Sequence, residues 1–340
     1  MVSTTSSINP TKIEIFLTFL TLGLSSFGGP IAHLGFFNKE LVIKKRWLDS
    51  QLFSELVALC QFLPGPSSSQ VGLSIGFIKG GFSGALAAWI GFTTPSAIIL
   101  ILFGYGYAVY SDVIPFGAIH GLKIFAVAIV AQAICTMGLT FCKDVKCIII
   151  TVAVGIFIVL APTPLFQFSA IILSGVIGAF VFNISETKEE SKFQYLIKIR
   201  LALTLLLSFF ILLFLLPILV NVLDNPVLSV IDSFYRAGSL VFGGGHVVLP
   251  LLQTEIVSAG YVSNEAFLAG YGAAQAMPGP LFTFAAYLGT VSGSYPNGLF
   301  GGLLALFAIY LPSFLLVIGV LPFWHELRKI VIFKKAIIGI

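Results

Sequence analysis

The sequence predicts an all-α polytopic membrane protein made of two inverted repeats with Pro/Gly-broken helices. Three observations predict this fold class. The mean hydropathy of the 340-residue chain is +1.05, and only 9% of its residues are charged. A pattern of glycine, proline and aromatic residues occurs twice, once in each half of the chain. Basic residues cluster in different loops of the two halves, which indicates that the halves insert with opposite orientation.

Apolar segments occupy most of the chain. A helix that crosses the hydrocarbon core of a bilayer needs about 20 mostly apolar residues. The long candidates are Ile13–Phe37, Phe82–Tyr110, Ala118–Cys142, Leu165–Asn183, Leu201–Leu223, Val227–Leu249 and Leu299–Trp324. Shorter or interrupted apolar pieces are Leu52–Lys79, Cys147–Leu160 and Ala266–Ser292. No stretch reads as a soluble catalytic module, so we predict that the protein is not an enzyme.

Patterns for metals and nucleotides are missing from the sequence. The four cysteines form no C-x-x-C pair and have no histidine at a metal-ligand spacing. The sequence has no G-x-x-x-x-G-K-[ST] loop, which argues against direct coupling to ATP. We therefore predict no metal, no cofactor and no nucleic-acid partner.

One series of residues recurs with nearly constant spacing in the two halves. The second copy follows the first by 215 residues up to a glutamate (255 − 40) and by 214 residues after it (278 − 64). The first copy is Phe27-Gly28-Gly29, Glu40, Trp47, Phe53, Gln61 and Pro64-Gly65-Pro66; the second is Phe242-Gly243-Gly244, Glu255, Tyr261, Phe267, Gln275 and Pro278-Gly279-Pro280. Interrupted helices at matching places in two halves indicate a transport site.

The chain divides at a polar stretch between the two copies. We predict a first transmembrane repeat over residues 1–183, a polar linker over 184–199 and a second transmembrane repeat over 200–340. The linker contains Ser185–Ser191, a charge-rich run typical of an exposed segment. After Pro95 the first half continues through three more apolar segments, whereas little follows its counterpart Pro312. We therefore expect the natural protein to continue beyond Ile340.

The distribution of basic residues predicts inverted orientation. Basic residues are retained on the cytoplasmic side of a membrane. The loop after the first glycine pair holds Lys39, Lys44, Lys45 and Arg46, whereas Leu251–Ser263 in the second copy holds none. The bias reverses later, because Arg328, Lys329, Lys334 and Lys335 have no basic counterparts in Ser111–Gly117. We expect the segments broken at Pro-Gly-Pro to enter and leave on the same face of the membrane.

The Pro-Gly-Pro breaks are the candidate substrate site. Within hydrocarbon, an interrupted helix survives only when it is buried in protein or lines a polar cavity. A half-helix that begins after the break exposes unpaired N–H groups and a positive dipole end, which suit an anion. The candidate residues are Pro64, Gly65, Pro66, Ser67, Ser68, Ser69 and Gln70 in the first repeat, with Pro278, Gly279, Pro280 and Thr283 in the second. The alternative is a kinked helix that only allows close packing.

The glycine pairs and four ionisable residues are further candidates. Gly28, Gly29 and Pro30, with Gly243 and Gly244, either build the site or only allow close helix packing. His33 and His246 follow these glycines and could carry coupling protons or be structural. A charge at membrane depth costs about 2.5–3.5 kcal/mol on insertion scales. Arg236 is therefore predicted as a fixed positive charge for an anionic substrate, and Glu55 as a second proton-coupling candidate.

These residues resemble the motifs of the chromate ion transporter family. The series from Phe27-Gly28-Gly29-Pro30 to Pro64-Gly65-Pro66 is similar to that family's amino-terminal motif. Phe242–Pro250 and Ala274–Pro280 are similar to its carboxy-terminal motif, with Tyr261 at a position where tryptophan is frequent. The resemblance implies the long, two-repeat form, which exports chromate from the bacterial cytoplasm through the inner membrane and uses the proton-motive force.

Three alternative functions share some of these features. A permease for sulfate or another inorganic anion would need the same site, because chromate and sulfate are near-isosteric dianions. A passive anion channel would show the same breaks but no accumulation driven by a gradient. A membrane-embedded enzyme is disfavoured because the sequence offers no nucleophile–base pair. The expected partners are a chromate or sulfate-like oxyanion and the lipid bilayer, and homo-oligomerisation stays open.

Overall fold

The computed structural model describes residues 10–110, 144–160, 164–182, 198–241 and 248–327, with scattered positions between 117 and 142 and at 330 and 335. Its contacts divide the chain into two compact units. The first consists of Met1–Ala126 and Lys198–Gly319, and the second of Val127–Ile197 and Val320–Ile340. The candidate site lies in the first unit.

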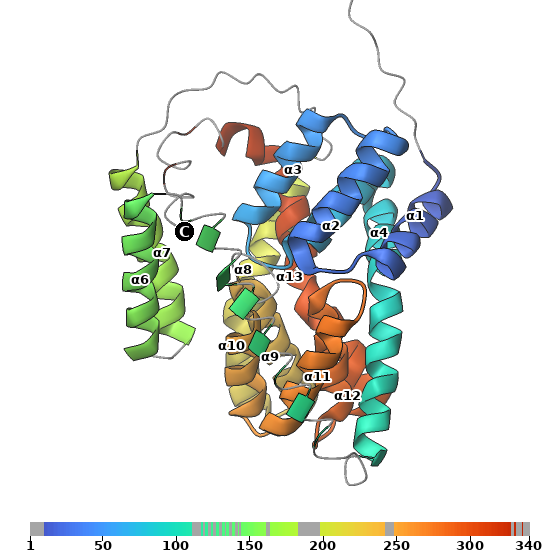
Figure 1. Cartoon of the computed structure of the whole chain (residues 1–340), viewed down its shortest axis with the longest axis vertical. Helices are drawn as coiled ribbons and strands as arrows, with labels where there is room; N and C mark the ends of the chain where they lie inside the picture. Colours follow the sequence, from blue (N-terminus) through green and yellow to red (C-terminus); the bar gives the residue numbers. More distant parts are fainter. Residues whose placement is uncertain are drawn as a thin grey trace, which may run out of the picture. The chain divides into compact units, whose positions relative to one another are not determined.

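The first repeat forms a series of helices, two of which begin at a side-chain cap. Thr11 accepts a hydrogen bond from the Glu14 N–H, and Asp49 accepts one from the Leu52 N–H, so both starts have the usual polar cap. The elements are α1 (Lys12–Ser25), α2 (Gly29–Phe37), the π-helix η1 (Asn38–Lys44), α3 (Ser50–Phe62) and α4 (Ser67–Tyr110). α4 runs past α1, α2 and α12 (Figure 1).

The second repeat forms a similar series, except that α4, which is interrupted at Gly81 (φ +63°, ψ −153°), corresponds to several separate helices. The caps are Asn225, which accepts from the Val227 N–H, and Ser263, which accepts from the Ala266 N–H. After α8 (Ile199–Leu223), the elements are α9 (Pro226–Leu240), α10 (Val248–Leu252), the π-helix η3 (Gln253–Val257), α11 (Asn264–Ala276), the 3-10 helix η4 (Leu281–Thr283), α12 (Phe284–Val291) and α13 (Gly298–Leu327). A π-helix therefore includes the matching glutamate of each repeat.

The second unit is represented by two apolar helices. They are α6 (Val145–Leu160) and α7 (Pro164–Val181), and they pack through Phe157 and Phe166, whose ring centroids are 5.5 Å apart. Most positions of the predicted segment Ala118–Cys142, and nearly all of the predicted linker, lie outside the described residues.

The described residues form helices and no strands, as the sequence predicts. Three helices are long and apolar enough to cross a membrane, namely Ser67–Tyr110, Ile199–Leu223 and Gly298–Trp324. Shorter apolar helices include Val145–Leu160 and Leu281–Val291. The chain is therefore an all-α, multi-pass membrane protein.

Two predicted apolar segments are interrupted in the structure. The segment Ile13–Phe37 was expected to be one helix, but α1 ends at Ser25 and α2 begins at Gly29. Gly28 has φ +94°, a conformation that side chains rarely adopt, and Pro30 occupies the first turn of α2. Likewise Val227–Leu249 does not form one helix, because α9 ends at Leu240. Hydrophobicity alone does not reveal these ends.

Glycine contacts show that the duplication extends into the packing. Gly23 of α1 lies against the Phe92 carbonyl oxygen of α4, and Gly238 of α9 lies against the Ile309 carbonyl oxygen of α13. The glycines are 215 residues apart (238 − 23) and the carbonyls 217 apart (309 − 92). A side chain at either glycine would separate the two helices. The repeats therefore share one packing arrangement, with a slightly longer turn before α13.

Candidate functional site

The two Pro-Gly-Pro breaks exchange backbone hydrogen bonds with the opposite repeat. The Gly65 N–H donates to the carbonyl of Val241 at 2.7 Å, and the Gly279 N–H donates to the carbonyl of Ser26 at 2.9 Å. Ser26 ends α1 and Val241 ends α9, so the acceptors are counterparts (241 − 26 = 215). Reciprocal contacts of this kind are made by elements related by a two-fold axis. Each break is therefore held by the other repeat.

Two serines of the long helices extend this symmetric arrangement. A Cβ added at Gly65 would lie 2.7 Å from Ser313 Oγ, and one added at Gly279 would lie 2.7 Å from Ser96 Oγ. The serines are counterparts (313 − 96 = 217), and each directly follows Pro95 or Pro312. Gly65 has φ +122° and Gly279 has φ +106°, so glycine satisfies both the backbone conformation and the close approach.

The first break is followed by a long, buried helix start. The first hydrogen bond of α4 runs from the Gln70 N–H to the Pro66 carbonyl at 2.9 Å. The N–H groups of Ser67, Ser68 and Ser69 therefore precede the intrahelical ladder and have no acceptor within it. All three serines are buried, at 3–7% exposure. This helix end carries unpaired donors and the positive end of the helix dipole away from solvent.

Three hydroxyl groups meet near this helix start. Ser69 Oγ, Thr93 Oγ1 and Tyr310 OH are buried, and none makes a hydrogen bond of standard geometry in the described part of the chain. The Ser69 and Thr93 side chains nevertheless lie within hydrogen-bonding reach of the Tyr310 hydroxyl, so the three groups satisfy one another only in part. A buried polar group without a partner costs about 1–3 kcal/mol. Three such groups beside a helix N-terminus indicate a place for a polar ligand or water rather than a packing contact.

His33, on α2, lies between the end of α1 and the start of α4. Its Nδ1 lies 3.2 Å from Ser68 Oγ, and its ring meets Phe92 edge-on at 5.4 Å. The ring also lies beside the backbone of Ser26, the residue that accepts from the second break. His33 Nε2 and Ser26 Oγ are buried, and neither has a partner among the described residues. His33 therefore lies where the two breaks meet.

Gln70 fixes the geometry of the break itself. Its Nε2 donates to the Pro64 carbonyl at 2.6 Å and to Ser313 Oγ at 3.3 Å. Its Oε1 is buried without a described partner. Because Oε1 is an acceptor, it cannot bind an anion directly, but it fits a bridging water. Gln70 therefore orients the break and is not a direct donor to an anion.

The second break has a different polar content. Leu281 and Phe282 stand where the first repeat has Ser67 and Ser68, and the Thr283 hydroxyl donates to the Pro280 carbonyl at 2.6 Å. The short helix η4 precedes α12, so this break begins with one turn of 3-10 helix. The first repeat consequently supplies most of the polar lining.

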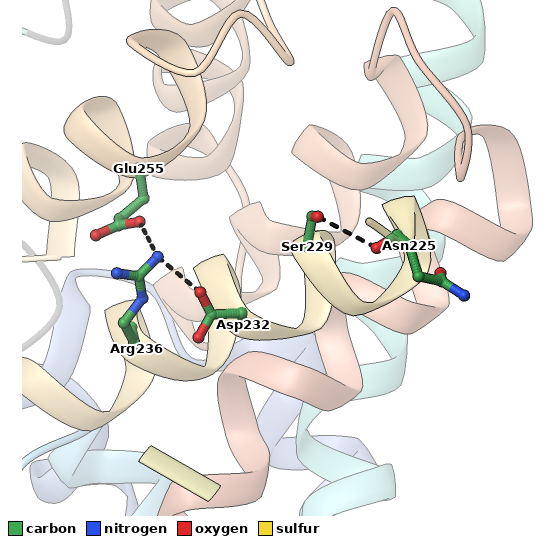
Figure 2. Close-up of polar contacts among 5 residues, drawn as sticks. All are labelled: Asn225, Ser229, Asp232, Arg236 and Glu255. Carbon is green, nitrogen blue, oxygen red and sulfur yellow. Dashed lines mark hydrogen bonds and ion pairs between the residues drawn. The ribbon is translucent and has the colours of Figure 1, made fainter. Parts of the chain in front are cut away.

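Arg236 is engaged by two carboxylates (Figure 2). Its NH2 lies 2.8 Å from Asp232 Oδ2 and 2.9 Å from Glu255 Oε2. The cluster carries two negative charges and one positive charge, so its net charge does not attract an anion. We therefore leave Arg236 out of the proposed substrate site.

The remaining predicted residues lie elsewhere. Glu55 is buried on α3, where its Oε1 accepts from Gln51 Nε2 at 3.4 Å. Gly28, Gly29 and Pro30 form the turn into α2. Gly243, Gly244 and His246 lie outside the described residues. No group of His, Cys, Asp and Glu residues in the described part of the chain could hold a metal ion.

Five site residues were not predicted: Ser26, Thr93, Ser96, Tyr310 and Ser313. A signal for two of them exists in the sequence, because Pro95-Ser96 and Pro312-Ser313 match at an offset of 217 (313 − 96). No comparable pattern marks Ser26, Thr93 or Tyr310 in the sequence, and only the packing brings them to the helix start.

These observations define a multi-pass α-helical membrane protein whose two repeats hold a pair of broken helices against each other. The chromate transporter family matches residues 13–181 and 228–340, so the chain belongs to this family. Its two matched stretches fall in the two halves of the chain. No solved structure matches.

Individual relatives match almost the whole chain. The transporter MJ0718 of Methanocaldococcus jannaschii is 25% identical over 96% of this chain and 80% of its own length. The chromate transport protein of Pseudomonas aeruginosa is 25% identical over 92% of this chain and 74% of its own. The probable chromate transport protein of Synechococcus elongatus is 27% identical, with corresponding shares of 92% and 76%.

Proposed function

We propose that this protein exports chromate from the cytoplasm as a secondary active transporter and binds the oxyanion at the start of α4. The observation that carries the proposal is the buried helix start with unpartnered donors around it. The chain's membership of the chromate transporter family supports chromate as the cargo.

The donors at this place suit a tetrahedral oxyanion. The N–H groups of Ser67, Ser68 and Ser69 provide a fixed partial positive charge. The hydroxyls of Ser69, Thr93 and Tyr310 can each donate one hydrogen bond. None of these donors carries a full charge that would hold the anion too tightly for release. Neutral donors also favour exchange with sulfate, which has the same shape and charge.

The two repeats supply the proposed alternating movement. Elements related by a two-fold axis can exchange their conformations, and alternating access in many transporters is largely a rocking of one repeat against the other. We infer that the axis lies in the membrane plane, which corresponds to the inverted repeats that the basic loops indicate. The reciprocal bonds of Gly65 and Gly279 would then persist at the pivot while the surrounding helices move.

His33 is the proposed link to the proton-motive force. Histidine side chains are among the groups that carry coupling protons in membrane transporters. His33 contacts Ser68 and leaves Nε2 unpartnered beside Ser26. In the proposed exchange, His33 would take up a proton from the outer side after the oxyanion has left and release it to the cytoplasm. Protons would then move inward as chromate moves outward.

Chromate flux into inside-out vesicles tests the function. We expect an imposed pH gradient to drive accumulation, and His33→Gln to abolish the effect of the gradient. Equilibration without accumulation would identify a passive channel. Accumulation of chromate only in right-side-out vesicles would identify an uptake system. Competition by sulfate measures how far the site discriminates between the two dianions.

A double variant tests the site. We expect Ser68→Ala with Ser69→Ala to lose most chromate flux and most chromate resistance of expressing cells. Ser74→Ala is the matched control, because Ser74 is a buried serine of the same helix whose hydroxyl donates to the Gln70 carbonyl at 2.8 Å. Equal flux in the double variant and the control would contradict the assignment.

A further inference from the structure

An open groove of about 690 Å³ lies between α1 and the segment formed by α2 and η1. α1 contributes polar side chains to it at a spacing of three or four residues, which places them on one face of the helix. These residues are Thr11, Glu14, Thr18, Thr21 and Ser25. A polar stripe of this length is unusual in a helix that is otherwise apolar and belongs to a membrane protein.

The outer end of the groove is basic. Lys39, Lys44 and Lys45 line it together with Glu14 and Glu40. Lys44 pairs with Glu40 at 2.7 Å and Lys45 pairs with Glu14 at 3.5 Å, whereas Lys39 has no ion pair within the described residues. Three cations and two anions leave one net positive charge. The loop is expected to be cytoplasmic because basic residues are retained on that side.

The far end of the groove lies one residue along the chain from the proposed substrate site. Ser25 lines the groove, and the next residue, Ser26, accepts from the Gly279 N–H and lies beside His33. The polar stripe therefore runs along α1 from the lysines to the residue before Ser26. The groove is open, whereas the hydroxyls around Ser69 are buried.

In the second repeat, an ion cluster stands at the positions that correspond to the groove. The groove residues Leu17, Thr21 and Glu40 have Asp232, Arg236 and Glu255 as counterparts (232 − 17 = 215; 255 − 40 = 215). There the Arg236 side chain spans from α9 to η3 and contacts both carboxylates (Figure 2). In the first repeat one ion pair, Lys45 with Glu14, joins the two elements at one end of the groove and leaves the rest of the groove open. In the second repeat the ion cluster stands at the positions that correspond to Leu17, Thr21 and Glu40 of the groove.

We propose that the groove along α1 is the cytoplasmic entry path of the oxyanion and that the Asp232–Arg236–Glu255 cluster closes the matching path of the second repeat. This inference rests on the proposed function, because it assigns a route to the same substrate site. Lys39 attracts the dianion. The Thr21 and Ser25 hydroxyls donate to the Leu17 and Thr21 carbonyls at 3.0 and 2.8 Å, and they would turn from these carbonyls to donate to the dianion as it passes.

Thiol labelling of α1 tests the path. The four native cysteines are replaced by alanine, and Thr21→Cys and Leu24→Cys are made in that background. Leu24 is the matched control, because it is exposed on the same helix but does not line the groove. A membrane-impermeant, negatively charged thiosulfonate reagent is added to inside-out and right-side-out vesicles of phosphatidylcholine with phosphatidylglycerol.

We expect the reagent to modify Thr21→Cys at least tenfold faster than Leu24→Cys, in inside-out vesicles only. Chromate or sulfate should slow the modification severalfold. Equal rates at the two positions, or modification only from the other side, would overturn the proposal. Protection that follows the phosphatidylglycerol content instead of the chromate concentration would assign the groove to a lipid headgroup and would also overturn it.

The result is separable from the proposed function. Labelling is read without transport, whereas the proposed function is read from the flux of the Ser68→Ala, Ser69→Ala variant. If Thr21→Cys is labelled as expected but the serine double variant keeps its flux, the substrate site is wrong and the entry path still stands. If the double variant loses flux but Thr21→Cys is labelled no faster than Leu24→Cys, the entry path is wrong and the substrate site still stands.

Discussion

The two helix breaks have the same backbone and different side chains. At both, a glycine with positive φ donates its N–H to the residue that ends α1 or α9 in the opposite repeat. The same glycine lies against a serine that follows a proline. The first break continues into three serines, whereas the second continues into Leu281 and Phe282. The shared part holds the repeats together, and the part that differs is the one to which we assign the oxyanion in the proposed function.

Breaking the ion cluster of the second repeat has the largest expected effect on the stability of the protein. Arg236→Gln leaves Asp232 and Glu255 without their cation, and removing one partner of a buried pair costs about 3–5 kcal/mol. Because Arg236 is one-third exposed, we expect a loss of unfolding free energy near the lower end, about 3 kcal/mol. Thermal unfolding in detergent measures it.

The control for this prediction neutralises the whole cluster. Asp232→Asn with Arg236→Gln and Glu255→Gln should recover most of the lost stability. If the triple variant stays as unstable as Arg236→Gln, charge compensation is not the role of the arginine. If Arg236→Gln is stable but binds chromate more weakly, Arg236 belongs to the substrate site after all.

Substituting the glycine at the centre of either break has the next largest expected effect on stability. Gly65→Ala and Gly279→Ala each force a side chain into a backbone conformation that costs about 1–3 kcal/mol, and each new Cβ meets a serine of the other repeat. We expect similar losses of stability in the two variants. Gly35→Ala is the control, because a Cβ there meets nothing within 4 Å. A loss at only one break would contradict the symmetric arrangement.

Removing one hydroxyl at each break distinguishes the break that binds chromate from the break that does not. Ser69→Ala removes a donor that has no described protein partner, and we expect the half-saturating chromate concentration to rise about tenfold, which corresponds to about 1.4 kcal/mol. Thr283→Ala removes a hydroxyl that is bonded to the Pro280 carbonyl. It should lower stability slightly and leave chromate affinity unchanged. The opposite pattern would place the substrate at the second break.

The smallest expected effect is that of Tyr310→Phe. Because the hydroxyl has no described hydrogen-bond partner, its removal should leave thermal stability unchanged or slightly raised. The same change should weaken chromate binding severalfold, since the hydroxyl lies beside Ser69 and Thr93. A loss of stability with unchanged affinity would show that the hydroxyl supports the fold only.

The sequence predicted the parts of the site that depend on local chemistry. Pro64-Gly65-Pro66 and its counterpart end helices wherever they occur, because proline lacks the N–H donor and clashes with the preceding turn. The break between α1 and α2 was missed because Ile13–Phe37 is apolar throughout. There the signal was Gly28 with Pro30, which acts through the backbone and not through hydrophobicity.

The parts that depend on packing could not be predicted. Arg236 was expected to attract an anion, and its partners are four and nineteen residues away on α9 and η3 (236 − 232; 255 − 236). The Tyr310 hydroxyl reaches Ser69 and Thr93 only because α13 crosses α4 at the break. The division into residues 1–183, 184–199 and 200–340 stays a prediction.

Equilibrium binding of radiolabelled chromate to the purified protein tests the proposed site most directly. The variant Ser69→Ala with Tyr310→Phe should bind chromate at least about tenfold more weakly than wild type while keeping its thermal stability. Ser74→Ala should bind like wild type. If the folded double variant binds chromate with unchanged affinity, the oxyanion is not held at the start of α4.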